Sequence, residues 1–235
     1  MRQIWIACVL LLSLGVTVQA SEVFAYPQTY VTIEKPANGT PVLVVRPEVS
    51  LGMITAAGAY ERRDDWSENA TQYLNEAATT ALTAKSYTTQ SAELTQFEDA
   101  HDLQLLKLNS VVVDTIAMNE VPLFALPTKT TFDWTLGEGA AALAPDDGDV
   151  KPAYVLFVQA QGTYSSGGRA ALAVGMMALG VGVPMGGQVV SASLVDLTSG
   201  RVVWYGTYAV APGTDIRTAE GAKTAIKQLF FKFPL

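Results

Sequence analysis

The chain has 235 residues, a formal net charge of −7 and 49% hydrophobic residues, which is enough for one domain with a core of its own. Because an acidic surface repels phosphates and no basic patch offsets it, we expect no nucleic-acid partner. A single cysteine and a single histidine argue against a zinc or copper site of the usual kind.

The first twenty residues have the pattern of a secretory signal peptide. Arg2 gives the positive start, an apolar run follows over 4–16, and Val18-Gln19-Ala20 is a small-residue cleavage pattern. The apolar run is too short for a helix that spans a bilayer. We therefore expect a signal peptide at 1–20, cleaved near Ala20, and a protein that is periplasmic or otherwise secreted.

Cys8 lies inside the apolar run, whereas a cysteine that carries a lipid would follow such a run. We interpret it as a small apolar residue of the signal peptide. Cleavage then leaves a chain without cysteine. Disulfides therefore contribute nothing to stability, and the hydrophobic core has to suffice.

The predicted elements begin after an extended lead-in at 21–40. A buried strand is predicted at 42–45, behind Pro41, and 49–57 is either a second strand or a loop. Asp65 and Glu68 form a capping-box-like pair at the start of a helix. The apolar stripe of this helix has helical spacing and consists of Trp66, Ala70, Tyr73, Leu74, Ala77, Ala81 and Leu82.

The middle of the chain indicates a short strand at 87–92 and a second long helix at 97–116. The apolar side chains of that helix are Leu103, Leu106, Leu108, Val111, Val112 and Ile116. A third helical segment is predicted over 132–143, and an acidic loop at 145–149 ends it.

The clearest strand patterns lie at 153–161, 189–197 and 201–210. Thr198-Ser199-Gly200 favours a hairpin loop between the last two. Thr214 or Asp215 is the predicted cap of a final helix whose inward residues are Ala219, Ala222, Ile226, Leu229 and Phe230. This order predicts an α/β fold: one mixed β-sheet packed with three to four helices, in a single domain at 41–235.

No pattern of catalytic, cofactor-binding or metal-binding residues is present. His101 falls in the second predicted helix, with nothing like a nucleophile elbow near it. Three aspartates of the acidic loop lack the spacing of a calcium loop, namely Asp146, Asp147 and Asp149. Four glycines fail the dinucleotide fingerprint, namely Gly180, Gly182, Gly186 and Gly187. We therefore predict no cofactor and no enzyme.

One segment is unusual for a soluble loop, because 170–185 carries no charge. It lies within a glycine-rich apolar insertion at 165–188 between two predicted strands. It is a core element, a contact with a subunit or partner, or a contact with a membrane. Flanking pairs of glycines favour the two contact alternatives. The candidate contact residues are Val174, Met176, Met177, Leu179, Val181, Val183 and Met185.

The strand at 154–158, the apolar insertion and the hairpin at 191–204 together resemble a family pattern. The hairpin contains an Asp-x-Thr-x-Gly turn, at Asp196, Thr198 and Gly200, and Trp204 beyond it. The pattern is similar to bacterial envelope proteins in the group of the TolB amino-terminal domain, CsgG and the lipoprotein activators of peptidoglycan synthases. The resemblance covers the carboxy-terminal third best. It implies an α/β sandwich that binds or oligomerises at the envelope without catalysis.

The leading hypothesis is a non-catalytic periplasmic accessory or assembly protein of a Gram-negative envelope. Its expected partners are envelope proteins, a second copy of itself, or a membrane surface contacted peripherally. One alternative is an envelope glycan hydrolase that uses carboxylates, which would need two facing carboxylates in one cleft. Another is a small-molecule binding domain with an apolar pocket beneath the insertion.

Overall fold

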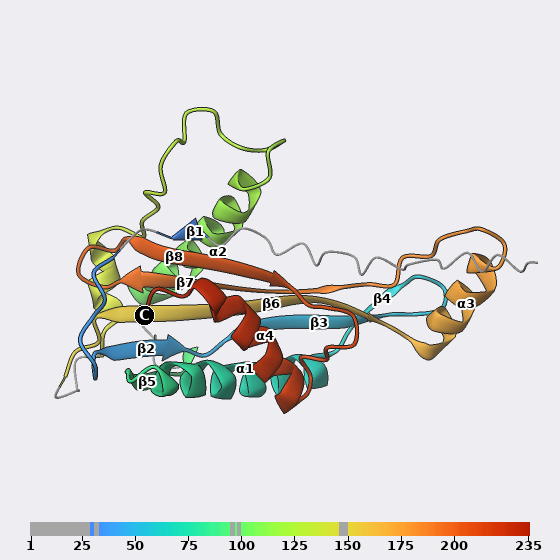
Figure 1. Ribbon diagram of the computed structural model, residues 1–235, viewed down its shortest axis with the longest axis horizontal. Helices are drawn as coiled ribbons and strands as arrows, with labels where there is room; N and C mark the ends of the chain where they lie inside the picture. The colour runs from blue at the N-terminus through green and yellow to red at the C-terminus, as the bar shows by residue number, and fades with distance from the viewer. Residues whose placement is uncertain (1–28, 31–32, 95–96, 98–99, 146–149) are drawn as a thin grey trace, which may run out of the picture.

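A computed structural model describes residues 29–30, 33–94, 97, 100–145 and 150–235 (Figure 1). The predicted signal peptide at 1–20 with its Cys8, half of the lead-in at 21–40 and the aspartates at 146–149 lie outside the described residues. These interpretations stay predictions.

The described strands form one mixed, curled sheet. Its strands are β1 (Thr29–Tyr30), β2 (Pro41–Val45), β3 (Glu48–Ile54), β4 (Tyr60–Arg62), β5 (Thr88–Ala92), β6 (Tyr154–Ser165), β7 (Gln188–Asp196) and β8 (Val202–Ala209). The order across the sheet is β1-β8-β7-β6-β2-β5. The pairs β2–β5, β2–β6 and β3–β6 are parallel, and the other pairs are antiparallel. The predicted strands are thus confirmed, and the 49–57 segment is mostly strand.

Strand β6 joins the two parts of the sheet, because one of its edges pairs with two successive strands. Its first residues pair with β2, from Val42 opposite Tyr154, and its later residues pair with β3, up to Ile54 opposite Ser165. Arg46 and Pro47 separate the two partners. The far half of β6 therefore extends the sheet beyond the part that β2 and β5 form (Figure 1).

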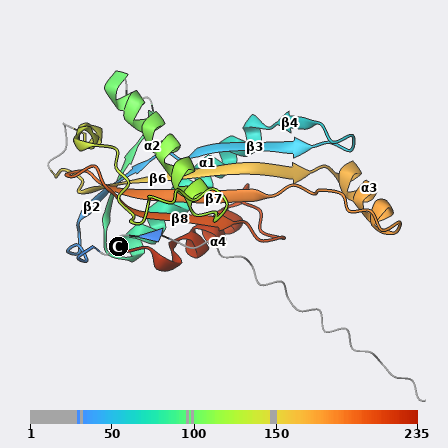
Figure 2. The ribbon, with the colours of Figure 1, turned by 90° about the horizontal axis from the view of Figure 1, so that it is seen from above.

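Four α-helices are described, and three of them cover the sheet. α1 (Asp64–Ala84) and α4 (Ala219–Leu229) pack on one face, whereas α2 (Ala100–Asn119) and the 3₁₀ helix η2 (Glu138–Leu143) pack on the other (Figure 2). Alternate strand residues supply the two cores: Val42 and Val44 face α1, and Leu43 and Val45 face α2. Burial on both faces explains why these strands read as continuous apolar runs.

Two predicted caps are wrong. The residue before α1 is Arg63, which makes no side-chain cap; Asp65 instead binds the Arg63 guanidinium, and Glu68 binds Arg46. The cap of α4 is Thr218, whose hydroxyl accepts from the Gly221 amide at 3.2 Å. The carboxylates expected to cap α1 are thus taken by two arginines, one of them distant in the chain. The cap of α4 comes three to four residues later than predicted.

The predicted face of the second helix and the predicted third helix also need correction. α2 buries Leu105, Asn109, Val113 and Ile116, and leaves Leu103, Leu108 and Val111 exposed. Of the other predicted residues, Ile116 is buried and Leu106 and Val112 are half-buried against the core. Apolar residues on several sides of α2 define no single stripe, so the prediction was right for three residues and wrong for three. The third helical segment shortens to η2, because Thr135 forms a bridge with Arg201 of the hairpin before it.

The remaining helix, α3 (Gly167–Met177), lies within the predicted insertion. It sits at the far end of β3, β4 and β6, away from the other helices in both views (Figures 1 and 2). Within the described part of the chain, no helix is long and apolar enough to cross a membrane.

Candidate functional site

The candidate site is the tip of the sheet, which we define as residues 165–188. The chain leaves β6 at Ser165, and the Ser166 amide donates to the Ile54 carbonyl at 2.9 Å. The Ser166 hydroxyl caps α3 by accepting from the Arg169 amide at 3.2 Å. The start of α3 is therefore fixed to the end of β3.

The other end of α3 closes in a Schellman motif around Gly180. The Gly180 amide donates to the Met177 carbonyl at 2.9 Å, and the Val181 amide donates to the Met176 carbonyl at 3.0 Å. Gly180 has a φ of +78°, a conformation that glycine adopts without steric cost. The motif turns the chain back toward the sheet.

The returning segment is bonded to the base of the tip. The Arg169 guanidinium donates to the Pro184 carbonyl at 2.8 Å, and the Ser165 hydroxyl donates to the Met185 carbonyl. The Thr163 amide donates to the Gly187 carbonyl at 2.9 Å. These bonds define the geometry of the tip at both ends. Of the flanking glycine pairs, Gly167 and Gly168 begin α3, and Gly186 has the positive φ of a tight turn, +81°.

Most of the seven predicted contact residues are exposed at this tip. Val174 is 72% exposed, Met177 71% and Leu179 76%; Val181 and Met185 are also exposed, and Met176 and Val183 are half-buried. Leu172 is exposed as well, and sequence reasoning missed it. Neither core cluster contains a residue of the tip. The tip is thus not the core element that was one of three alternatives.

The electrostatics of the tip are simple. Arg169 is the one charged residue between Ser166 and Val195, and its guanidinium lies at the base, beside Gly58 in the β3–β4 turn. The tip can therefore enter an apolar environment without burying a charge.

A separate polar pocket of about 170 Å³ lies on the α2 face of the sheet. It holds two carboxylates, those of Glu48 and Asp114, both on exposed residues. The Ser110 hydroxyl accepts from the Gln159 amide at 3.0 Å and lies 3.5 Å from a Glu48 carboxylate oxygen. The glycan-hydrolase alternative needs two carboxylates in one cleft, and the sequence did not indicate which ones. In the structure, Glu48 and Asp114 come together in this pocket.

The other residues considered from sequence lie apart from both places. His101 is exposed on α2, beside Gly139 of η2. The described residues hold no group of three or more histidine, cysteine, aspartate or glutamate side chains arranged for a metal ion.

No family model matches this sequence, and no curated protein matches it either.

Solved structures give distant likenesses. A putative neuraminyllactose-binding hemagglutinin homolog from Helicobacter pylori is 10% identical, with a TM-score of 0.43 over 88% of this chain and 89% of its own. The PelC dodecamer from Paraburkholderia phytofirmans is 15% identical, with a TM-score of 0.34 over 86% and 96%. The LpoB C-terminal domain from Salmonella enterica is 17% identical, with a TM-score of 0.29 over 74% and 84%. The expected resemblance to bacterial envelope proteins is thus met as a distant structural likeness, too distant to define a family or an activity.

Proposed function

We propose that this protein is a non-catalytic accessory protein of a bacterial cell envelope, and that it contacts a membrane surface through its tip. The observation that carries the proposal is the set of exposed apolar side chains on and after α3, at the far end of the sheet. The envelope location rests on the predicted signal peptide.

Exposure of this kind is costly in water. Fully burying one large apolar side chain contributes about 1.5–3 kcal/mol. The six exposed apolar side chains of the tip, with Leu172 included, are between 43% and 76% exposed, so they can supply on the order of 5–10 kcal/mol on contact with an apolar phase. Monomeric soluble proteins rarely leave a contiguous apolar patch of this size without a use for it.

A membrane fits the tip better than a protein groove does. Protein interfaces have a polar rim around their apolar centre, whereas the tip is apolar and uncharged out to its end. A segment at the membrane interface combines an apolar end with basic residues at the level of the headgroups. Arg169 at the base of the tip has that position.

The acidic body does not oppose such a contact. β6 has twelve residues, which corresponds to about 40 Å of strand. That length is several times the Debye length of about 8 Å at physiological ionic strength. Acidic residues at the β2 end of the sheet are therefore screened from a membrane that the tip touches. At the base of the tip, the acidic Glu61 of β4 is followed directly by the basic Arg62, so no net negative charge builds up there.

Co-sedimentation with phospholipid vesicles tests the proposal. We expect the mature chain to bind zwitterionic vesicles, and the double variant Val174→Asp/Met177→Asp to lose binding. The matched control is Val111→Asp/Met118→Asp on α2, where the wild-type residues are 61% and 57% exposed. No binding by the unsubstituted chain, or equal binding by both variants, would refute membrane contact. Cross-linking of the tip to one envelope protein without vesicle binding would replace the membrane with a protein partner.

The domain organisation belongs to the same proposal. We infer a signal peptide at 1–20, a lead-in at 21–40 and a single domain at 41–235 with its insertion at 165–188. The mass of the protein recovered from the periplasm measures the cleavage site directly. A mature chain that begins well away from Ser21 would contradict this organisation.

A second candidate function rests on the polar pocket. Glu48 and Asp114 line one pocket, and a carboxylate-dependent glycan hydrolase acts through two carboxyl groups in one site. A general acid of this kind needs a carboxyl shielded from water, and both residues are exposed, so we rank this candidate second. Release of sugar fragments from peptidoglycan by the mature chain, abolished by Glu48→Gln and by Asp114→Asn, would promote it above the first.

A further inference from the structure

A groove of about 650 Å³ lies between α1 and α4, on the side of these helices away from the sheet. Its walls combine an apolar floor with charged ends of long side chains. The residues that line it are Tyr73, Glu76, Ala77, Thr80, Ala81, Ala84, Lys85, Ala219, Glu220, Lys223, Ile226, Lys227 and Phe230. Its volume falls within the range of small-molecule sites, about 300–1,000 Å³.

Small side chains keep the groove open. Ala77, Ala81 and Ala84 form the stripe of α1 that faces α4, next to the stripe that packs on the sheet. The methyl groups of these alanines are too small to fill the space between the two helices on the outer side of their contact. The apolar lining is the outer edge of the core between α1, α4 and the sheet: Ile226 and Phe230 belong to that core, and Ala77 and Ala81 pack against it.

The two helices run in the same direction, so the groove has distinct ends. Arg217, just before α4, stacks on Trp66 in the first turn of α1. At the other end, the Lys85 ammonium after α1 donates to the Leu235 backbone oxygen at 2.9 Å. The starts of the helices therefore lie together, and so do their ends.

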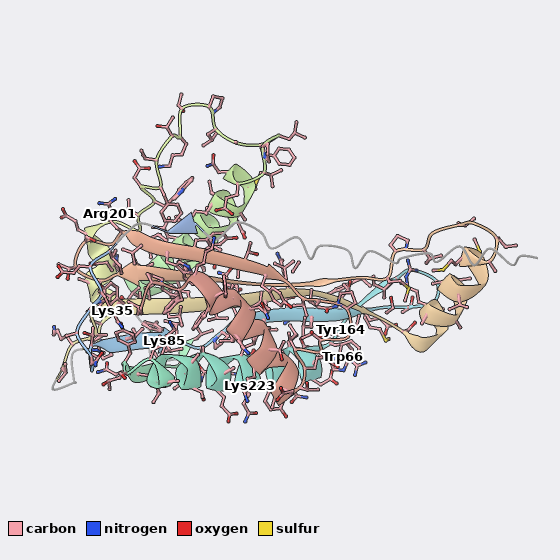
Figure 3. All side chains as sticks on the ribbon, in the orientation of Figure 1. Lys35, Trp66, Lys85, Tyr164, Arg201 and Lys223 are labelled. Carbon is pink, nitrogen blue, oxygen red and sulfur yellow. The ribbon has the colours of Figure 1, made fainter. Side chains whose placement is uncertain are left out.

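Two carboxylates and three ammonium groups line the groove, namely Glu76, Glu220, Lys85, Lys223 and Lys227. Glu220 lies at the start of α4, whereas Lys227 and Lys85 lie toward the ends of the two helices. None of the ion pairs between described residues involves Lys223 or Lys227. Figure 3 shows Lys223 on α4 and Lys85 at the end of α1. In a protein of net charge −7, this end of the groove is suited to an anion.

We propose that the groove binds a long-chain fatty acid, with its carboxylate beside Lys223 and Lys227 and its chain along Ala77 and Ala81. From Tyr73 to Lys85 the groove follows about 18 Å of helix, close to the roughly 15 Å that the acyl chains of one leaflet span. An amphipathic helix, about 10–12 Å wide with its side chains, is too thick for this volume. The site is independent of the tip.

Calorimetric titration of the mature chain with palmitate, below the concentration at which palmitate forms micelles, tests the proposal. We expect saturable binding of one palmitate, weaker binding of hexadecanol, and at least about tenfold weaker binding of laurate, because each buried methylene contributes about fourfold in affinity. Ala81→Trp, which fills the groove, should abolish binding. Lys223→Glu/Lys227→Glu should weaken the binding of palmitate by about fivefold or more and leave the binding of hexadecanol unchanged.

The matched control is Lys107→Glu/Arg201→Glu, two exposed cations away from the groove, which should leave palmitate binding unchanged. Far-ultraviolet circular dichroism shows whether each variant is folded. Absence of palmitate binding by the unsubstituted chain overturns the proposal, as does equal binding by the groove variants and the control. Binding of an amphipathic helical peptide in place of palmitate, lost in Ala81→Trp, overturns it in favour of a protein ligand.

Discussion

The guanidinium of Arg217 lies 3.8 Å from the centre of the Tyr164 ring. It also lies 4.3 Å from the centre of the Trp66 ring, and the two rings meet edge to face at 5.7 Å. Asp215 binds the same guanidinium at 2.8 Å. This cluster joins the far part of β6 to the start of α1 and the approach to α4, and so fixes the base of the tip (Figure 3).

Replacing Arg217 by alanine removes two cation–π contacts and an ion pair. We expect Arg217→Ala to lower the free energy of unfolding by about 1–2 kcal/mol, measured by urea denaturation. Arg201→Ala, at an exposed position of the β7–β8 turn, is the control and should change it by less than about 0.5 kcal/mol. Equal values for the two variants would contradict the role of the cluster.

The same cluster predicts how stability depends on acid. Arg217, by its hydrogen bonds, lowers the pKa of Asp215 below its ordinary value. A carboxyl whose pKa is lowered by folding contributes stability above its unfolded pKa of about 3.9, and that contribution is lost as the pH falls through the folded pKa. We expect the melting temperature of Arg217→Ala to fall less steeply below pH 4 than that of the wild type. Parallel curves would show that Asp215 gains nothing from Arg217.

The contribution of Glu120, just after α2, to stability has the opposite dependence on pH. Burial raises its pKa to about 7, and its Oε1 has no hydrogen-bond partner among the described residues. A carboxyl whose pKa is raised by folding costs stability progressively as the pH rises from its unfolded pKa of about 4.3 to about 7. We expect Glu120→Gln to raise the melting temperature at pH 8 and to have much less effect at pH 4. Glu138→Gln, on η2, is the control; an equal gain at both pH values would be inconsistent with this assignment.

Gly200, in the β7–β8 turn, and Gly213, between β8 and α4, form a matched pair for substitution by alanine. Both have positive φ, +67° and +88°, but a Cβ at Gly200 would collide with the Gly137 carbonyl, whereas a Cβ at Gly213 would meet nothing within 4 Å. We expect Gly200→Ala to destabilise by about 3 kcal/mol or more, and Gly213→Ala by about 1 kcal/mol. Chemical denaturation measures both. A similar cost at the two sites would mean that the collision is relieved by a shift of η2.

Deleting residues 170–185 should leave the domain folded. The tip adds no residue to either core, and Ser165 and Gly187 lie at adjacent strand ends, where Gly162 is paired with Gln188. We expect a cooperative transition with a melting temperature within about 5 °C of the wild type, and unchanged tryptophan fluorescence. A non-cooperative transition would indicate that the tip is needed for the fold.

Local patterns were sufficient for most elements. In the predicted stripe of α1, Ala70, Leu74 and Leu82 are buried, and the other four residues are half-buried against the same core. The predicted turn around Gly200 connects β7 to β8. The uncharged run at 170–185 also marked the tip, because a run without charge is visible in the sequence alone. What failed was local detail that distant residues decide. Glu68 binds Arg46 instead of capping α1, and α2 buries Leu105 and Val113 while the predicted Leu108 and Val111 stay exposed.

The sequence by itself determined the long strands and the helices α1, α2 and α4, because the spacing of apolar residues records which of their faces leave water. It did not indicate β4 or the helical form of α3. The tertiary structure alone decided where those faces meet. It pairs β6 with both β2 and β3, and thereby carries α3 out to the end of the sheet with Val174, Met177 and Leu179 exposed. It also lays α4 along α1 and leaves the groove between them. Both places depend on contacts between residues far apart in the chain, which local periodicity does not encode.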